Sequence, residues 1–140
     1  MDSTLEVFSH AEKLASLGQR KDAESAWTIY IERITREMKN TDNGEDLSSL
    51  KDKLAVAYNN RGYLRYLMVD FDKAVDDYTA GLQNNEKLPV LFYNRGLIHY
   101  RLGRFGDAIQ DQEKCLQLDN DFKSAALCLE QSIADRDSEQ

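Results

Sequence analysis

Side chains that could carry out chemistry are few in this sequence and stand apart from one another. His10 and His99 each lack a cysteine, histidine or acidic residue at the spacing of a zinc ligand, and His10 is expected to pack partly buried. Cys115 and Cys128 form no Cys-x-x-Cys motif and are interpreted as buried, reduced thiols. The sequence contains neither a Gly-x-Ser-x-Gly elbow nor a glycine-rich phosphate loop. It therefore predicts a protein that is not an enzyme and holds no metal and no cofactor.

Neighbouring aspartates are the remaining candidates for catalysis. The pairs Asp70/Asp72 and Asp76/Asp77 offer two carboxylates each. A solvated helix surface explains them better than a catalytic pair, so we expect them to face solvent.

Length and charge limit the class of protein. The chain has 140 residues, a size that fits one domain with its own core. Its 25 acidic residues outnumber 18 lysines and arginines, and the net charge of -7 argues against binding to nucleic acid or a polybasic membrane anchor. No apolar run approaches the ~18 residues that span a bilayer, and the acidic start lacks the features of a secretory signal. We expect a cytoplasmic protein, with nuclear entry left open.

The elements that must position any functional side chain are predicted to be helices. One proline and seven glycines occur in the whole chain, so helix breakers are scarce. Apolar and aromatic residues follow a helical spacing at Tyr63, Leu64 and Leu67, and again at Leu91 and Ile98. Regular strand alternation is absent. The predicted fold class is all-α.

Self-comparison reveals a repeat of 34 residues. Residues 55–88 align without a gap to residues 89–122 and match at ten positions. The matching pairs are Val56/Val90, Asn60/Asn94, Arg61/Arg95, Gly62/Gly96, Tyr66/Tyr100, Phe71/Phe105, Ala74/Ala108, Asp77/Asp111, Leu82/Leu116 and Gln83/Gln117. The recurring glycines and alanines predict that the two helices of each unit approach closely, because small side chains leave room for the facing backbone.

The repeated blocks resemble the tetratricopeptide repeat. The resemblance is carried by Tyr58–Gly62 and Phe92–Gly96, each followed by an aromatic residue, a turn and a small residue in a second helix. A weaker copy covers residues 4–37 and departs from the pattern at Arg20 and Tyr30. The resemblance implies a single α-solenoid domain over residues 1–140, with helix-turn-helix repeats at 4–37, 55–88 and 89–122, an insertion at 38–54 and a capping helix at 123–136.

The insertion and the final segment have their own patterns. Residues 40–44 are typical of a turn, and Asp46 is expected to cap a helix that continues through Leu47, Leu50 and Leu54. The last helix is expected to cover the end of the solenoid with one apolar face, formed by Phe122, Ala125, Ala126, Leu129 and Ile133.

The resemblance also implies a concave groove lined by the first helix of each repeat. The groove residues it indicates for peptide binding are Glu12, Asn59, Asn60, Tyr63, Tyr93, Asn94, Leu97 and Arg101. Relatives use an asparagine at the position of Asn60 and Asn94 to hold a peptide backbone, because a carboxamide both donates and accepts hydrogen bonds. The alternative is that each asparagine bonds locally between helices.

One specialised groove can be compared residue by residue. Repeats that clamp the terminal carboxylate of chaperones use Lys, Asn, Asn, Lys and Arg, where this chain has Phe8, Glu12, Asn60, Val90 and Asn94. Only Asn60 matches, and Glu12 would repel a carboxylate. The sequence therefore predicts a non-catalytic adaptor that binds a protein or peptide partner without such a clamp. The alternative is a structural subunit or scaffold that self-associates through the solenoid ends, although we expect a monomer.

Overall fold

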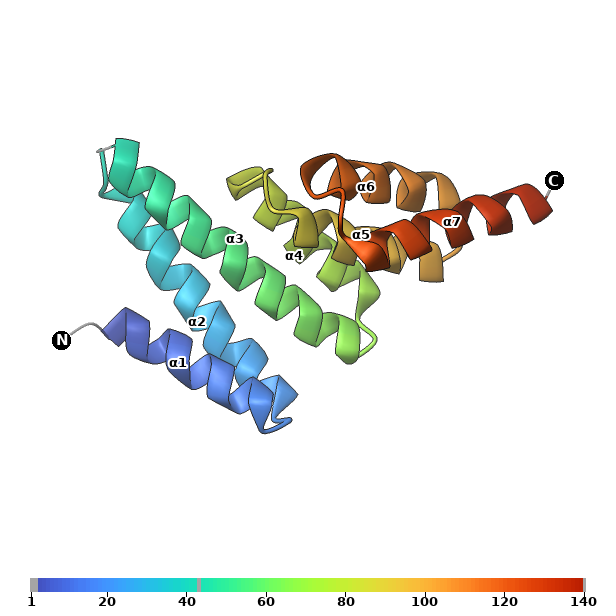
Figure 1. The fold of residues 1–140 in the computed structure, drawn as a ribbon. Coiled ribbons are helices and arrows are strands. Elements are labelled where there is room, and N and C mark those ends of the chain that lie inside the picture. The colour runs from blue at the N-terminus through green and yellow to red at the C-terminus, as the bar shows by residue number, and fades with distance from the viewer. Residues whose placement is uncertain (1–2, 43, 140) are drawn as a thin grey trace. The chain divides into compact units, whose positions relative to one another are not determined.

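The computed structural model describes residues 3–42 and 44–139, and over these ranges the chain forms helices joined by short turns, without a strand (Figure 1). The helices are α1 (Ser3–Ser16), α2 (Arg20–Lys39), α3 (Gly44–Leu67), α4 (Phe71–Asn84), α5 (Pro89–Arg101), α6 (Phe105–Leu118) and α7 (Lys123–Ser138). The predicted all-α class is confirmed. Within the same residues, no helix combines the length and apolar character needed to cross a bilayer.

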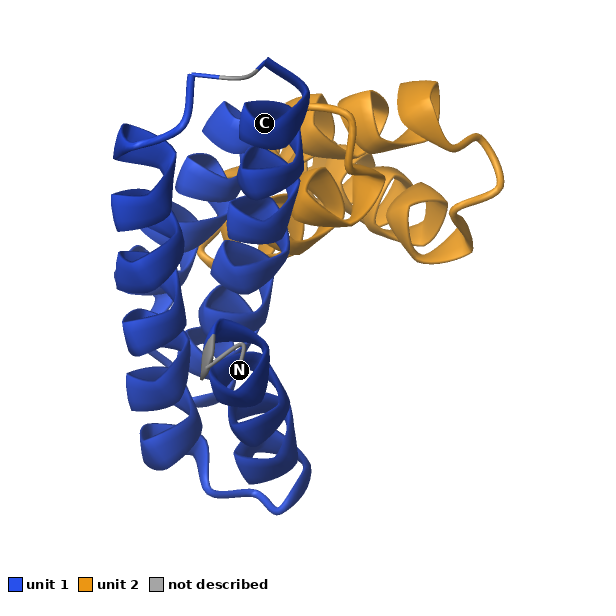
Figure 2. Ribbon diagram, turned by 90° about the vertical axis from the view of Figure 1, so that its left-hand side faces the viewer, with its two compact units in different colours: residues 1–85 blue, residues 86–140 orange. Residues whose placement is uncertain are grey.

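The helices group into two compact units, coloured separately in Figure 2. Residues 1–85 hold α1 to α4, and each of these helices packs against the next one along the chain. Residues 86–140 hold α5 to α7, where α6 packs against both α5 and α7 and α5 also touches α7. That the whole chain forms one domain stays a prediction.

Two helices of the first unit are longer than the rest. α2 has 20 residues and α3 has 24, whereas α4, α5 and α6 have 14, 13 and 14. The insertion therefore continues as helix, as the apolar spacing of Leu47, Leu50 and Leu54 predicted. Asp46 lies inside the first turn of α3, where its charge complements the helix dipole, and does not precede the helix as a cap. Asn43 of the expected turn lies outside the described residues.

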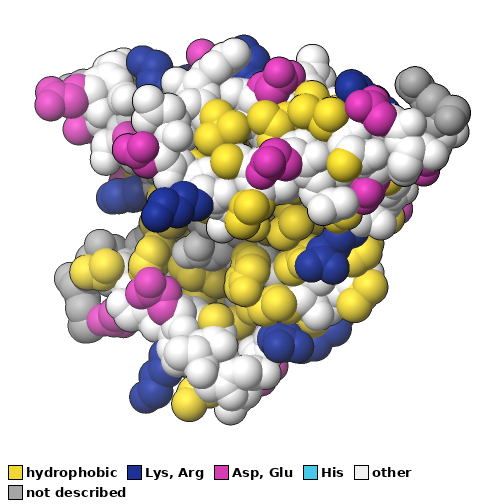
Figure 3. All heavy atoms as spheres, turned by 45° about the vertical axis from the view of Figure 1, so that its right-hand side comes forward, with side chains coloured by type: hydrophobic (Ala, Val, Ile, Leu, Met, Phe, Trp, Pro, Cys, Tyr) yellow, Lys and Arg dark blue, Asp and Glu magenta, His cyan; other side chains and the backbone are white. Residues whose placement is uncertain are grey.

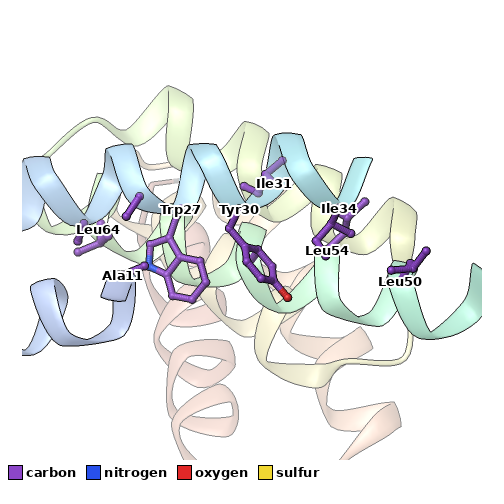
Figure 4. Close-up of a cluster of buried hydrophobic side chains, with 11 residues drawn as sticks. Ala11, Trp27, Tyr30, Ile31, Ile34, Leu50, Leu54 and Leu64 are labelled. Atoms are coloured by element: carbon purple, nitrogen blue, oxygen red, sulfur yellow. The ribbon is translucent and has the colours of Figure 1, made fainter. Parts of the chain in front are cut away.

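A hydrophobic core fills the space between α1, α2 and α3. Trp27 and Tyr30 project from the same side of α2 (Figure 4) and are both buried. The ring of Phe8 meets them edge-on, with centroids 4.9 Å and 5.3 Å away. Tyr30, where the first repeat departs from the expected small residue, is thus a core residue. Leu50 belongs to the same cluster, so the insertion contributes to the core.

Close helix approach at two glycines is confirmed. A Cβ atom at Gly62 would lie 2.9 Å from the ring of Tyr78, and one at Gly96 would lie 2.5 Å from Nε2 of Gln112 and 3.0 Å from Cβ of Asp111. Real Cβ atoms do not come this close to neighbouring atoms. The glycines therefore allow α3 to pack on α4 and α5 to pack on α6.

The turns between α1 and α2, between α3 and α4 and between α5 and α6 have the same backbone geometry. In each turn one residue has a positive φ. Gly18 and Gly103 have φ of +76° and +75°, and Val69 takes the corresponding place with φ of +62°. In each turn the amide of this residue donates to a carbonyl three residues back, and the next amide reaches a carbonyl five residues back, as in a Schellman motif. Val69 is β-branched, so it holds this conformation under steric strain.

Three expectations about individual side chains are wrong. Asp77 is buried rather than solvated, because two arginines of α3 hold its carboxylate, whereas Asp76 beside it is exposed. His10 is exposed rather than partly buried. In α7, Ile133 points into solvent, and the face that packs inward carries Ala125, Cys128 and Ser132. The small polar Ser132 fits there because its hydroxyl donates to the carbonyl of Cys128 at 2.6 Å.

Candidate functional site

One face of α3 carries a stripe of side chains that the core does not use. Lys53, Val56, Asn60 and Tyr63 follow one another at intervals of three, four and three residues, which places them along one side of the helix. Val56 is 39% exposed and Tyr63 is 49% exposed. Exposed apolar side chains also appear between charged ones on the face shown in Figure 3. Apolar surface rimmed by polar groups is typical of a protein interaction site.

A hollow adjoins this stripe where α1, α2 and α3 meet. Its larger part measures about 310 Å³ and is lined by Phe8, Tyr30, Ser49, Asp52, Lys53 and Val56. A second part of about 210 Å³ is lined by Thr4, Leu5, Phe8, Tyr30 and Lys53. We call the two parts together the α1–α3 hollow. Of its two aromatic rings, Tyr30 belongs to the hydrophobic core and Phe8 packs against it, so neighbouring side chains hold both rings in place.

Asn60 is the half-buried polar residue of the stripe. Its side chain makes no hydrogen bond with the part of the chain that the structure describes. Asn59 and Asn94 are both engaged by interactions of their own. The two recurring asparagines therefore differ: Asn94 has an interaction of its own, whereas Asn60 has none with the described residues.

Aromatic rings extend the stripe toward the end of α3. Tyr63 stacks on Tyr66 with centroids 6.1 Å apart, and Tyr66 stacks on Phe71 of α4 at 5.8 Å. A stacked tyrosine is already ordered, so it can present apolar area to a ligand at little further cost in entropy.

The second unit carries its predicted residues on α5. The ring of Tyr93 packs against Phe122 at 5.0 Å, and the Tyr93 carbonyl accepts a hydrogen bond from Gln112. Leu97 is half-buried and Arg101 is exposed. In the first unit, Glu12 is exposed on α1, and Asn59, Asn60 and Tyr63 share α3. The structure thus places four predicted residues on each unit.

Part of the lining of the hollow was not predicted from the sequence. Tyr30 was treated as a departure from the repeat pattern, and Ser49 and Lys53 fall in the insertion. The available signal was the helical spacing of residues 49, 53 and 56, which puts the insertion and the groove position Val56 on one face.

Ion pairs on another side of α3 fix the orientation of the stripe. Arg65 donates to Glu24 at 2.9 Å and to Asp77 at 3.0 Å, which ties α3 to α2 and α4. Burial would raise the pKa of Glu24, but the hydrogen bond and charge of Arg65 hold it below its usual range. Burial would lower the pKa of Arg61, but its bond to Asp77 raises it. These charges are paired and serve the fold.

The two buried cysteines offer little reactivity. Burial raises the pKa of Cys115 to about 11 and also raises that of Cys128, so neither forms the reactive thiolate near neutral pH. Across residues 3–42 and 44–139, no group of three or more His, Cys, Asp and Glu side chains is arranged to hold a metal ion.

Comparisons with known proteins agree with this architecture. Residues 89–122 match the family model described as tetratricopeptide repeat. The chain is similar to the Sgt2 TPR domain from Aspergillus fumigatus, at 12% identity and a TM-score of 0.77, covering 99% of this chain and 82% of that one. It is also similar to the first TPR of Spaghetti (RPAP3) bound to the HSP90 peptide SRMEEVD, at 18% identity and a TM-score of 0.74, covering 94% and 90%. A third similar structure is the Yersinia enterocolitica type III secretion chaperone SycD in complex with a peptide of the translocator YopD, at 15% identity and a TM-score of 0.75, covering 97% and 96%.

Two findings together define the fold of the chain. One repeat is recognised by its sequence, and nearly the whole chain has the fold of tetratricopeptide-repeat domains. The chain is thus an all-α solenoid of helical repeats, and its residues 89–122 match the tetratricopeptide repeat.

Proposed function

We propose that the protein is a non-catalytic adaptor that binds a peptide segment of a partner protein on the exposed faces of α1 and α3, and that α5 carries a separate contact surface of its own. The observation that carries the proposal is Asn60: an available carboxamide between the exposed side chains of Val56 and Tyr63. A peptide backbone needs both a donor and an acceptor, and a carboxamide supplies both.

Similar structures support this class of function. The Spaghetti and SycD structures each hold a peptide of another protein. Both of the buried cysteines here are free thiols, which suits the reducing conditions of the cytoplasm, where we place the adaptor.

We propose further that the site is not a clamp for a terminal carboxylate. Glu12 is exposed on α1 at a position where the clamp would need a neutral asparagine, and a second carboxylate would be repelled there. The HSP90 peptide SRMEEVD provides the test. Amidation of its C-terminus removes the terminal charge, and we expect the free and amidated peptides to bind equally. A large loss on amidation would show that a clamp exists.

The adaptor function is tested by selecting a random peptide library displayed on phage against the purified chain. We expect a peptide consensus that the Asn60→Ala variant fails to enrich. Asn120→Ala is the matched control, because Asn120 is exposed in the turn between α6 and α7, far along the chain from α3. Failure of the wild-type chain to enrich any peptide would contradict the proposal.

Self-association is the second candidate function, favoured by the apolar side chains exposed on α6 and α7. Leu118 and Leu127 are both exposed there. Light scattering over a range of concentrations would detect a dimer, and Leu127→Glu should dissociate it. A monomer at every concentration would exclude this candidate.

A further inference from the structure

The α1–α3 hollow owes one wall to the insertion between the repeats. Ser49, Asp52 and Lys53 lie on the part of α3 that comes before residue 55, where the repeat pattern begins. Among the α3 side chains that line the hollow, only Val56 belongs to the repeat pattern. The hollow is therefore a feature of this chain's insertion.

The size of the hollow indicates what it can hold. Its larger part measures about 310 Å³ and its smaller part about 210 Å³. Sites for small molecules usually measure about 300–1,000 Å³ and enclose most of the ligand. A shallow hollow at the lower limit of this range is suited to one or two bulky side chains of a bound peptide. Its apolar lining comes from Leu5, Phe8, Tyr30 and Val56.

The charges around the hollow are unequal. Lys53 lines both parts, is exposed, and forms no ion pair with any residue that the structure describes. Asp52 is the one carboxylate lining the two parts, within the described residues, and its Oδ1 already accepts a hydrogen bond from Asn85 at 3.0 Å. Lys53 also borders a third, polar hollow that contains Glu37 and Asp46. Its flexible stem allows the ammonium group to turn toward a ligand in the apolar hollow.

We propose that the α1–α3 hollow is an anchor pocket for a bulky apolar side chain of the partner peptide, and that Lys53 selects peptides with a side-chain carboxylate beside that anchor. The inference rests on the proposed adaptor function and adds the chemistry of its ligand. Burial of the apolar side chain supplies affinity, and the charge pair with Lys53 supplies selectivity. The backbone then continues along α3 toward Asn60.

The test uses a random peptide library fused through its C-terminus to a phage coat protein, so that no terminal carboxylate is present. It is selected against the wild-type chain, Lys53→Glu, Val56→Ser and the control Lys51→Glu. Lys51 is exposed on the same part of α3 but lines none of the hollows described, and its substitution changes the net charge equally. All these positions are exposed, so the variants are expected to fold.

The wild-type chain and Lys51→Glu should enrich peptides in which an acidic residue neighbours a large apolar one, whereas Lys53→Glu should favour a basic neighbour. Fluorescence polarisation with the enriched peptide should show a loss of about two- to fivefold for Lys53→Glu. Val56→Ser should lose about three- to tenfold.

Several outcomes would overturn the proposal. Some peptides could need Asn60 for binding and yet bind to Lys53→Glu and Val56→Ser as tightly as to the wild-type chain. This result would support the adaptor function and disprove the anchor pocket. Equal losses of peptide affinity for Lys51→Glu and Lys53→Glu would show that the net charge of the chain attracts the peptide, without a specific contact at Lys53. A dimer that Val56→Ser dissociates would show that a second copy fills the hollow. No enrichment by the wild-type chain would contradict both the pocket and the adaptor function.

Discussion

The guanidinium of Arg61 on α3 donates two hydrogen bonds to the carboxylate of Asp77 on α4, from Nε to Oδ2 at 2.9 Å and from Nη2 to Oδ1 at 2.7 Å. Its remaining amino group donates to the hydroxyl of Thr28 on α2 at 3.0 Å. Arg61 therefore links α3 to both α4 and α2, at the position next to Asn60.

The same pair occurs again in the second unit. Arg95 donates to Asp111 at 2.9 Å and 2.7 Å, 34 residues further along the chain. Both aspartates are buried, and bidentate pairs of this kind are specific in geometry. The pair is therefore part of how each unit joins its two helices.

Removal of Asp77 should destabilise the first unit. Asp77→Ala leaves two arginines, Arg61 and Arg65, without their shared carboxylate, and its side chain is only 3% exposed. Breaking a buried pair in this way costs about 3 kcal/mol. Asp76→Ala, at the exposed neighbouring position, should change stability by less than about 0.5 kcal/mol. Urea unfolding measures the free energy of unfolding of both variants. Equal losses would show that the buried ion pair does not contribute to stability.

Alanine should have opposite effects at two glycines of the second unit. At Gly96 the new methyl group would meet Gln112 and Asp111, so Gly96→Ala should cost about 1–3 kcal/mol. At Gly106, near the start of α6, nothing lies within 4 Å, so Gly106→Ala should gain about 0.5 kcal/mol. Urea unfolding followed by circular dichroism distinguishes the two. A neutral Gly96→Ala would show that the side chain of Gln112 moves aside freely.

Much of the architecture could be predicted because the repeat places similar residues in similar surroundings. The 34-residue shift identified Gly62 and Gly96 as points of close approach, and both are. The same comparison contained Arg61 with Asp77 and Arg95 with Asp111 at one spacing of 16 residues. Asp77 was nevertheless expected on a solvated helix face, because its arginine partners lie on another helix and the spacing along its own helix does not show them.

The candidate site was harder to predict than the fold. The availability of Asn60 and the engagement of Asn94 depend on contacts around each side chain, and the two residues occupy equivalent positions in the repeats. The hollow depends on Tyr30 and Lys53, which the repeat pattern treats as an exception and as part of an insertion. The repeat pattern describes the residues that the repeats have in common, whereas the hollow is formed mostly by residues that occur in the first unit alone.

Replacement of Val69 by glycine should stabilise the protein. A non-glycine residue in the left-handed region costs about 1–2 kcal/mol, and glycine gives back part of this through its greater freedom in the unfolded chain. We therefore expect Val69→Gly, with φ of +62° at this position, to gain about 0.5–1 kcal/mol in urea unfolding. Gly103→Val is the reciprocal change and by the same balance should cost about 0.5–1 kcal/mol. A loss on Val69→Gly would mean that contacts of the valine side chain outweigh its backbone strain.

Acidification should weaken the second unit through His99. Its side chain is only 13% exposed, its Nδ1 has no hydrogen-bond partner among the described residues, and its Nε2 lies 3.9 Å from Asp111. Burial lowers its pKa; the charges of Asp111 and Asp107 oppose this, and those of Arg95 and Arg104 add to it.

In the unfolded chain, a histidine takes up its proton near pH 6.5, whereas His99 in the folded protein takes it up at a lower pH. The unfolded state therefore binds more protons below about pH 6.5, and stability falls as pH falls. Urea midpoints at about pH 7.5 and about pH 5.5 should differ less for His99→Gln than for the wild-type chain. His10→Gln, at an exposed histidine, should keep the wild-type difference. If all three proteins lost stability equally, the acid sensitivity would have to come from groups other than His99.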